Sequence, residues 1–246
     1  MRLGADELRT IERLHVRAWP ALETADIDGW LWRWSGGGSK RANSVSTVRY
    51  VGTDPNAALD EVERRYRERN TAVLVQTYDL SEPHGLSDLL QERGYVNAES
   101  TLTMWKAVER KKTSVDSEVS DAPGPDWLDV YLGAITEDRR AVNAQILQSI
   151  PEPNACFTCR RGGRVISTAL CVAAGEFGAV ECMATRADAR REGGAATVLN
   201  ALEAWASEHN VKHLALQVVA TNEPAIALYT RCGFVPVATN RFWSKS

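Results

Sequence analysis

The sequence predicts an α/β chain of the α+β type, built from two similar halves that each hold a mixed, mostly antiparallel sheet flanked by helices. Segments with strand-like alternation and segments with apolar residues at helical spacing follow one another along the chain. A polar stretch rich in Ser and Pro, residues 109–125, reads as a linker. A helix end, a glycine, an aromatic residue and a strand follow one another in both 90–96 and 229–235. This repeat indicates the duplication of one fold.

Residues 1–108 form the first predicted domain. Residues 29–34 and 44–51 alternate like strands, and residues 54–70 supply a charged helix. Three glycines at 36–38 lie between the two strands. A phosphate-binding loop needs the pattern GxxxxGK[ST] followed by a helix, so the glycines predict a hairpin turn instead.

Residues 126–246 form the second predicted domain, and its elements are clearer. Apolar residues at helical spacing end at Pro151, and small or β-branched residues on both sides of Gly162-Gly163 indicate a hairpin. The expected order is one or two helices in 127–150, strands 155–160, 165–173 and 178–185, a helix 195–209, a strand 214–219, a helix 224–231 and a strand from 234. This order predicts a mixed sheet flanked by helices.

Charge and hydropathy exclude several classes of partner. The formal net charge of -3 offers no basic excess for nucleic acid. No apolar run approaches the roughly 20 residues that span a bilayer, and the first residues do not resemble a signal peptide. We therefore expect no nucleic-acid or membrane partner and a cytoplasmic location. The oligomeric state leaves no signature in the sequence.

The cysteines indicate core thiols. Their number, five, is odd, and they are scattered through apolar runs. Cys156 and Cys159 form a CxxC within a predicted strand, where residues three apart point to opposite faces of the sheet. With no second pair of ligands at matching spacing, we expect no metal site.

The segment Arg190-Arg191-Glu192-Gly193-Gly194-Ala195 carries the clearest chemistry. It lies between a predicted strand and a predicted helix, where free backbone amides and the positive end of the helix dipole suit a pyrophosphate. A plain strand-to-helix loop is the alternative, because glycine-rich loops are weak evidence alone.

This loop matches the [QR]xxGx[GA] acyl-CoA signature of the GNAT superfamily of N-acetyltransferases, with Ala195 where many members have glycine. Residues 216–229 resemble the second motif of that superfamily through Asn222, Ala225 and Tyr229. The resemblance covers about residues 126–246. It implies that acetyl-CoA, as the acyl donor, lies where two parallel strands splay apart, with its pantetheine on strand backbone and its pyrophosphate on loop amides. The residues implied are Met183, Ala184, Thr185, Arg190, Arg191, Gly193, Gly194, Ala195, Ala196, Asn222 and Ala225.

The resemblance also suggests two catalytic residues. An alkyl amine has a pKa of about 10.4, so it is protonated at neutral pH and must lose a proton before it attacks. The reaction therefore needs a base or a water relay. Glu181 is the candidate base, because the family often places a carboxylate on this strand; the alternative is an ion-paired strand residue. Tyr229 occupies the family's position for the acid that protonates the departing thiolate, and the alternative is a core tyrosine.

The first half departs from these motifs. Pro83 and Leu90 stand 139 positions before Asn222 and Tyr229, and no acyl-CoA loop precedes them. We therefore expect a degenerate GNAT half without acetyl-CoA, in a tandem arrangement similar to that of mycothiol synthase-like proteins. Aromatic and polar residues gather around one predicted hairpin of this half: Trp30, Trp32, Arg33, Lys40, Arg41 and Asn43. They either reach across the cleft to the acceptor or form a sheet face whose side-chain ends are exposed to solvent.

The predicted function is direct acetyl transfer from acetyl-CoA to an amine, carried by a small molecule or a peptide that the sequence does not identify. The motifs place no cysteine at the reacting centre, which favours direct transfer over an acetyl-enzyme. The alternative is a non-catalytic acyl-CoA-binding sensor or regulatory module. The length of the preferred acyl chain stays open.

Overall fold

The computed structural model describes residues 3–109 and 116–246. Within them, the helices are α1 (Ala5–Ala18), α2 (Pro55–Glu68), α3 (Leu86–Glu92), α4 (Pro125–Gly133), α5 (Glu137–Leu147), α6 (Gly194–Glu208) and α7 (Glu223–Arg231), with short 3-10 helices η1 (Arg41–Asn43) and η2 (Ala187–Ala189). The strands are β1 (Glu23–Ile27), β2 (Trp30–Trp34), β3 (Val45–Ser46), β4 (Val73–Thr77), β5 (Val96–Ala107), β6 (Ser117–Ser120), β7 (Asn154–Arg161), β8 (Arg164–Ala174), β9 (Phe177–Thr185), β10 (His213–Val219) and β11 (Val235–Lys245).

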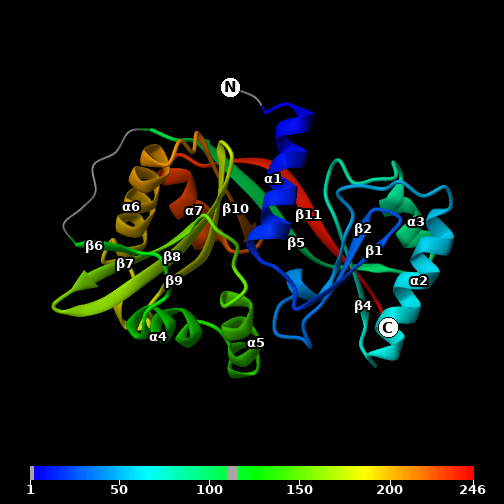
Figure 1. The fold of residues 1–246 in the computed structure, drawn as a ribbon, viewed down its shortest axis with the longest axis horizontal. Helices are drawn as coiled ribbons and strands as arrows, with labels where there is room; N and C mark the ends of the chain where they lie inside the picture. Colours follow the sequence, from blue (N-terminus) through cyan, green and yellow to red (C-terminus); the bar gives the residue numbers. More distant parts are fainter. Residues whose placement is uncertain (1–2, 110–115) are drawn as a thin grey trace.

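All of these strands belong to one continuous sheet of mixed but mostly antiparallel pairing. Its order is β1-β2-β3-β4-β11-β5-β10-β9-β8-β7-β6. Strand β11, from the second half, pairs with β4 and β5 of the first half, and β5 in turn pairs with β10 of the second. Figure 1 shows β11 and β5 side by side across the middle of the molecule. Strand β11 therefore lies between two strands of the first half, and β5 lies between two strands of the second.

The predicted repeat is confirmed as a structural one. Gly94 and Gly233 both have positive φ, 81° and 90°, directly after the ends of α3 and α7. Each glycine and the aromatic residue after it lead into a long strand, β5 in one copy and β11 in the other. These two strands pair antiparallel with each other, so the equivalent segments of the two halves meet at the centre of the sheet.

Hydrophobic residues cover both faces of the second half of the sheet. One cluster packs α6 and α7 against it, and a second packs α1, α4 and α5 against the opposite face. Cys159 belongs to the first cluster and Cys156 to the second, which confirms that these two cysteines point to opposite faces. A third cluster, around Trp30, Trp32 and Tyr66, forms the core of the first half.

Two features tie the halves together apart from the exchanged strands. Helix α1 belongs to the first half but contacts β8, β9 and β10 of the second, and Figure 1 shows it over the centre of the molecule. The Lys106 ammonium on β5 lies 2.7 Å from the Glu203 carboxylate on α6, and both side chains are buried. Lys106 Nζ also donates to the carbonyl of Cys232 at 3.0 Å.

The expected second-half elements form close to the predicted bounds, whereas two first-half expectations are wrong in part. Of the strand expected over 44–51, only Val45–Ser46 forms, because the chain beyond it bonds to the segment after β4: the Thr47 carbonyl accepts from Glu82 N, and Tyr50 N donates to the Glu82 carboxylate. The tight hairpin joins β1 to β2 through Asp28-Gly29, with φ of 51° and 89°. Residues 36–38 instead begin a wider loop between β2 and β3.

The expected linker 109–125 contains the edge strand β6. Residues 110–115 of that linker lie outside the described residues. Where the chain divides into domains stays a prediction, since one sheet runs through both halves. In the described part of the chain, none of the helices has the length and apolar character that crossing a membrane requires.

Candidate active site

The parallel strands β9 and β10 separate part-way along their length. They pair from Phe177 with His213 to Val180 with Leu216 and no further. Cys182 has a positive φ of 51°, and the register between β8 and β9 shifts at the same place, so β9 carries a bulge there. The gap opens at the carboxyl ends of the two strands, the edge at which open α/β sheets bind ligands.

The loop that precedes α6 lies beside this gap and has the geometry of an anion site. Gly193 is the N-cap residue with φ of 83°. Among the described residues, no N-cap side chain accepts a hydrogen bond from the first amides of α6, and its first turn contains no acidic residue. The first amides of a helix lack helical partners and face outward, so they are available to a phosphate. A Cβ on Gly194 would lie 2.4 Å from Ser167 Oγ, so only glycine lets the helix approach β8 this closely.

The other residues predicted to bind the cofactor lie around the same gap. Arg190 and Arg191 are exposed, and Ala195 and Ala196 are half-buried in the first turn of α6. On β9, Ala184 is buried, and the hydroxyl of Thr185 lies 2.9 Å from that of Ser167.

The equivalent places in the first half are filled by the chain itself. The Asp54 carboxylate caps α2 by accepting from the amides of Asn56 and Ala57, at 2.9 and 3.2 Å, where α6 leaves its amides free. The Thr47 hydroxyl bridges to the Gln76 carbonyl and to the Ser81 hydroxyl, each at 2.8 Å, across the equivalent gap. Leu90, in the position of Tyr229, is buried in the apolar core. These contacts agree with a degenerate first half.

A cleft of about 660 Å³ lies over the gap and is lined by both halves of the chain. Of the predicted site residues, Met183, Asn222, Ala225 and Tyr229 line it. The Asn222 side chain also caps α7 by accepting from Ala225 N at 3.3 Å. The first half contributes Trp19, Gly37, Gly38, Ser39, Lys40, Arg41, Asn43, Leu74, Glu99 and Thr101.

The six first-half residues singled out in the sequence divide into two groups. Trp30, Trp32 and Arg33 are buried within the first half. Lys40, Arg41 and Asn43 line the cleft, because the loop from β2 to η1 reaches over to α5. The Gly38 carbonyl accepts from Arg139 Nε at 2.7 Å and from Asn143 Nδ2 at 3.1 Å, which fixes this loop against the second half.

Tyr229 has the surroundings of a neutral proton donor. It is buried next to Phe234, with ring centroids 6.1 Å apart, and it lines the cleft. Burial, and then the negative charge of Glu181, raise its pKa to about 12. The hydroxyl therefore keeps its proton at neutral pH.

Glu181 is held by two residues of the first half. Arg41 makes two hydrogen bonds to its carboxylate, at 2.8 and 2.5 Å, and His15 Nδ1 lies 3.3 Å from Oε1. Burial alone would raise the pKa of Glu181, but the charge and hydrogen bonds of Arg41, helped by His15, outweigh burial and lower the pKa to about 2. A carboxylate so stabilised accepts a proton poorly, which opposes the predicted role of general base.

The structure brings to the site three residues that no sequence pattern predicted: His15, Trp19 and Tyr131. Trp19 and Tyr131 line the cleft, with their rings 6.4 Å apart, and the Arg41 guanidinium lies 5.7 Å from the Trp19 ring. Helix α1 carries apolar residues at helical spacing, and His15 and Trp19 read as part of that apolar face. No local signal distinguishes them from core residues.

The family of this chain is shown by its similarity to known proteins. The sequence profile described as "Probable histone acetyltransferase Rv0428c C-terminal" matches residues 5–243. The chain belongs to this family. It is an N-acetyltransferase of the GNAT superfamily, which confirms the resemblance seen in its motifs.

Similar proteins of known sequence or structure agree with this assignment. The uncharacterized N-acetyltransferase YobR of Bacillus subtilis (strain 168) is 25% identical, over 96% of this chain and 98% of the relative. A GCN5-related N-acetyltransferase from Kribbella flavida superposes with a TM-score of 0.69 at 16% identity, covering 96% of this chain and 95% of the other. A tandem GNAT protein from the clavulanic acid biosynthesis pathway gives a TM-score of 0.61 at 10% identity, covering 100% of this chain and 96% of the other. The shared fold extends over both halves.

Proposed function

We propose that this acetyltransferase uses acetyl-CoA, binds it in the second half alone and transfers the acetyl group directly to an amine. The contrast between two equivalent helices carries the proposal. Helix α6 begins at an uncapped pair of glycines beside the separated strands β9 and β10, whereas α2 is capped by Asp54. Only the first of these helix ends leaves its amides free for a pyrophosphate.

The cofactor would extend from this helix end into the gap. Its pyrophosphate would lie on the amides of Arg191, Gly193, Gly194, Ala195 and Ala196. The side chains of Arg190 and Arg191 would lie on the exposed side. Its pantetheine arm would run along the backbone of residues 183–185, which faces the gap beyond the last pair with β10. Asn222 and Ala225 line the cleft next to it.

The reaction follows from these positions. The amine attacks the thioester carbonyl, and the C–S bond breaks when the tetrahedral intermediate collapses. The CoA sulfur takes a proton from Tyr229, and Tyr229 regains one from the proton that the nitrogen of the intermediate loses as the amide forms. A backbone amide of the separated strand would stabilise the oxyanion. The cleft side opposite the cofactor, with Trp19, Lys40 and Arg41 of the first half, would receive the acceptor.

Replacing Tyr229 with phenylalanine removes the proposed donor and keeps the ring. We expect kcat to fall by about 10²-fold, because general-acid catalysis contributes on that order, with unchanged affinity for acetyl-CoA. Stopped-flow thiol release and calorimetric titration measure the two quantities. An unchanged kcat would show that water protonates the thiolate.

Cofactor binding is tested by placing a carboxylate in the anion site. In Gly193→Glu, the new side chain enters the space proposed for the pyrophosphate, and we expect the affinity for acetyl-CoA to fall by at least about 100-fold in calorimetric titration. Gly85→Glu is the matched control: Gly85 is also an exposed N-cap glycine, with φ of 81° against 83°, and neither position has a heavy atom within 4 Å of an added Cβ. The control should bind like the wild type.

The outcome also separates the competing functions. A wild-type chain that fails to bind acetyl-CoA would refute the proposal. Binding without thiol release towards L-lysine, spermidine, glucosamine and a lysine-containing histone-tail peptide would instead support a non-catalytic acyl-CoA sensor. The peptide belongs in this panel because the family's description names histone acetylation.

A further inference from the structure

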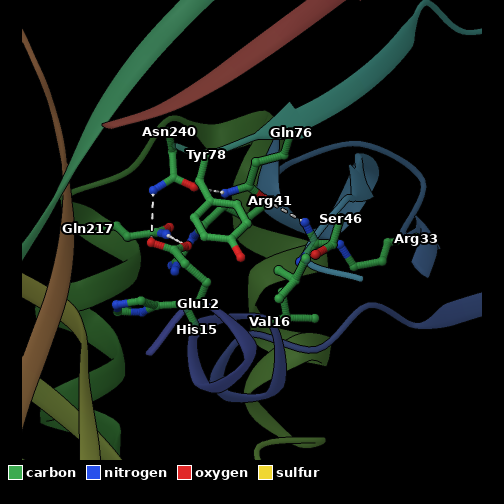
Figure 2. A pocket seen from close by; sticks show the side chains of 11 residues that line it. Glu12, His15, Val16, Arg33, Arg41, Ser46, Gln76, Tyr78, Gln217 and Asn240 are labelled. Carbon is green, nitrogen blue, oxygen red and sulfur yellow. Dashed lines mark hydrogen bonds between the residues drawn. The ribbon is translucent and has the colours of Figure 1, made fainter. Parts of the chain in front are cut away.

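A small polar cavity lies beneath the cleft, where α1 meets the sheet. Its volume is about 10 Å³, which is the space that one water molecule needs. Figure 2 shows the side chains that line it, from α1 and other parts of the first half and from the second half. Its lining is mostly polar and includes Glu12, His15, Arg41, Tyr78, Gln217 and Asn240.

Three buried polar atoms at this cavity have no hydrogen-bond partner among the described residues: His15 Nε2, Tyr78 Oη and Gln217 Oε1. Buried polar atoms without a hydrogen-bond partner destabilise the folded state. A water molecule makes two to four hydrogen bonds, and a polar space of this size holds one, so a water here would supply the kind of partner that these atoms lack.

The ion pair at Glu181 fixes the tautomer of His15, a residue that lines the cavity. Because the Glu181 carboxylate is ionised, it accepts only, and His15 Nδ1 at 3.3 Å must donate to it. In neutral His15, the proton therefore lies on Nδ1, and Nε2 is left as an acceptor. This is the arrangement in which a carboxylate orients a histidine base.

The cavity adjoins the reacting centre. Arg41 and Gln217 line both the cavity and the cleft, so their side chains form the wall between the two spaces. Gln217 directly follows Leu216, the last residue of β10 that pairs with β9, and it therefore lies where the gap opens. A proton that leaves the cleft past Arg41 and Gln217 enters the space that His15 also lines.

We propose that His15, a residue of the first half, takes up the proton of the acceptor ammonium through an internal water, with Glu181 orienting its ring. The N–H bond of the ammonium breaks and its electron pair stays on nitrogen. The proton passes to water at the wall of the cleft, and the internal water delivers one to Nε2, which gives an imidazolium. After the products leave, His15 Nε2 releases the proton by the same route to solvent in the cleft. This inference rests on the proposed function.

The groups around the ring are suited to this task. Glu181 on β9 accepts from Nδ1, and Glu12, one turn before His15 on α1, lines the cavity as a second carboxylate. Glu12 also accepts from Thr103, Gln217 and Asn240, at 2.6, 3.0 and 3.2 Å. The remaining charged or titratable groups at the cavity are Arg41, Arg33 and Tyr78.

His15→Asn is the sharpest test, because the asparagine amide can still donate to Glu181 from about the position of Nδ1, while the Nε2 acceptor is lost. We expect kcat/KM for the best acceptor among L-lysine, spermidine, glucosamine and the histone-tail peptide to fall by about 100-fold or more. The rise of kcat/KM with pH should also flatten, while the affinity for acetyl-CoA stays within about 2-fold. His209→Asn, at an exposed histidine, is the matched control and should leave all three unchanged.

A pH profile of His15→Asn identical to that of the wild type would overturn the inference and leave the proposed function intact. A wild type that turns over none of the four acceptors would overturn both. If His15→Asn does not fold, a high-resolution crystal structure of the wild type decides. The inference requires a water within about 3.2 Å of His15 Nε2, and a dry cavity would refute it.

Discussion

Replacing Arg41 with methionine is expected to lower the free energy of unfolding by about 3–5 kcal/mol at pH 7. In this variant the Glu181 carboxylate stays buried and loses both hydrogen bonds from Arg41. Of its partners in the described residues, only His15 Nδ1, 3.3 Å away, remains. Urea denaturation measures the loss. Lys40→Met is the matched control, because the neighbouring Lys40–Glu99 pair is partly exposed and should contribute no more than about 1 kcal/mol.

The same variant should change how stability depends on pH. In the wild type, the pKa of Glu181 falls from its usual 4.5 to about 2 on folding, which corresponds to about 3 kcal/mol. This stabilisation is present above pH 4.5 and is lost as the pH falls from 4.5 towards 2. Without Arg41, burial raises the pKa instead, so the variant recovers stability relative to the wild type as the carboxyl protonates on acidification. An equal difference at pH 7 and pH 4 would contradict this account.

A chain that ends at Phe234, and therefore lacks β11, is expected not to fold in either half. It loses Phe242 and Trp243, both buried, and substitutions of such residues by alanine alone cost about 3–5 kcal/mol each. It also loses Asn240, whose side chain bonds to Gln76 of β4 and Thr103 of β5. The sum approaches or exceeds the whole stability of a typical domain, about 5–15 kcal/mol.

Circular dichroism and a two-dimensional amide NMR spectrum measure the loss of fold. A chain without only Ser246, which is exposed and follows β11, is the control and should keep the wild-type spectrum. A cooperative unfolding transition that survives in the shorter chain would show that at least one half is independent of the exchanged strand.

Local patterns in the sequence predicted the second half well. Its strands and helices are long and periodic, and the glycines at the start of α6 have a single backbone role, so each could be inferred from its neighbours in the chain. The repeat was also visible, because Gly94 and Gly233 mark equivalent helix ends. Edge strand β6 was missed because its residues, Ser117–Ser120, are mostly polar and exposed.

Contacts between distant residues could not be inferred from one sequence. Arg41 and Glu181 are 140 residues apart, so the charged partner that lowers the pKa of the predicted base leaves no local trace. The exchange of β5 and β11 is equally non-local. The residue pattern of each strand is the same whether the strand pairs within its own half or with the other half. The site was therefore predicted in its cofactor residues, while its acceptor side, built from the first half, emerged only in three dimensions.

The place of β11 has a consequence for synthesis on the ribosome. Within the described residues, the strand is translated after the ten other strands, yet it lies between β4 and β5, which are made much earlier. Until residues 235–245 emerge, β4 and one edge of β5 lack their partner, and unpaired strand edges bind other strands readily. The nascent chain therefore lacks a central strand of its sheet, and cannot complete its fold, throughout the translation of the second half. For this chain, exposure to aggregation should be greatest during that interval, when a chaperone that shields strand edges would act.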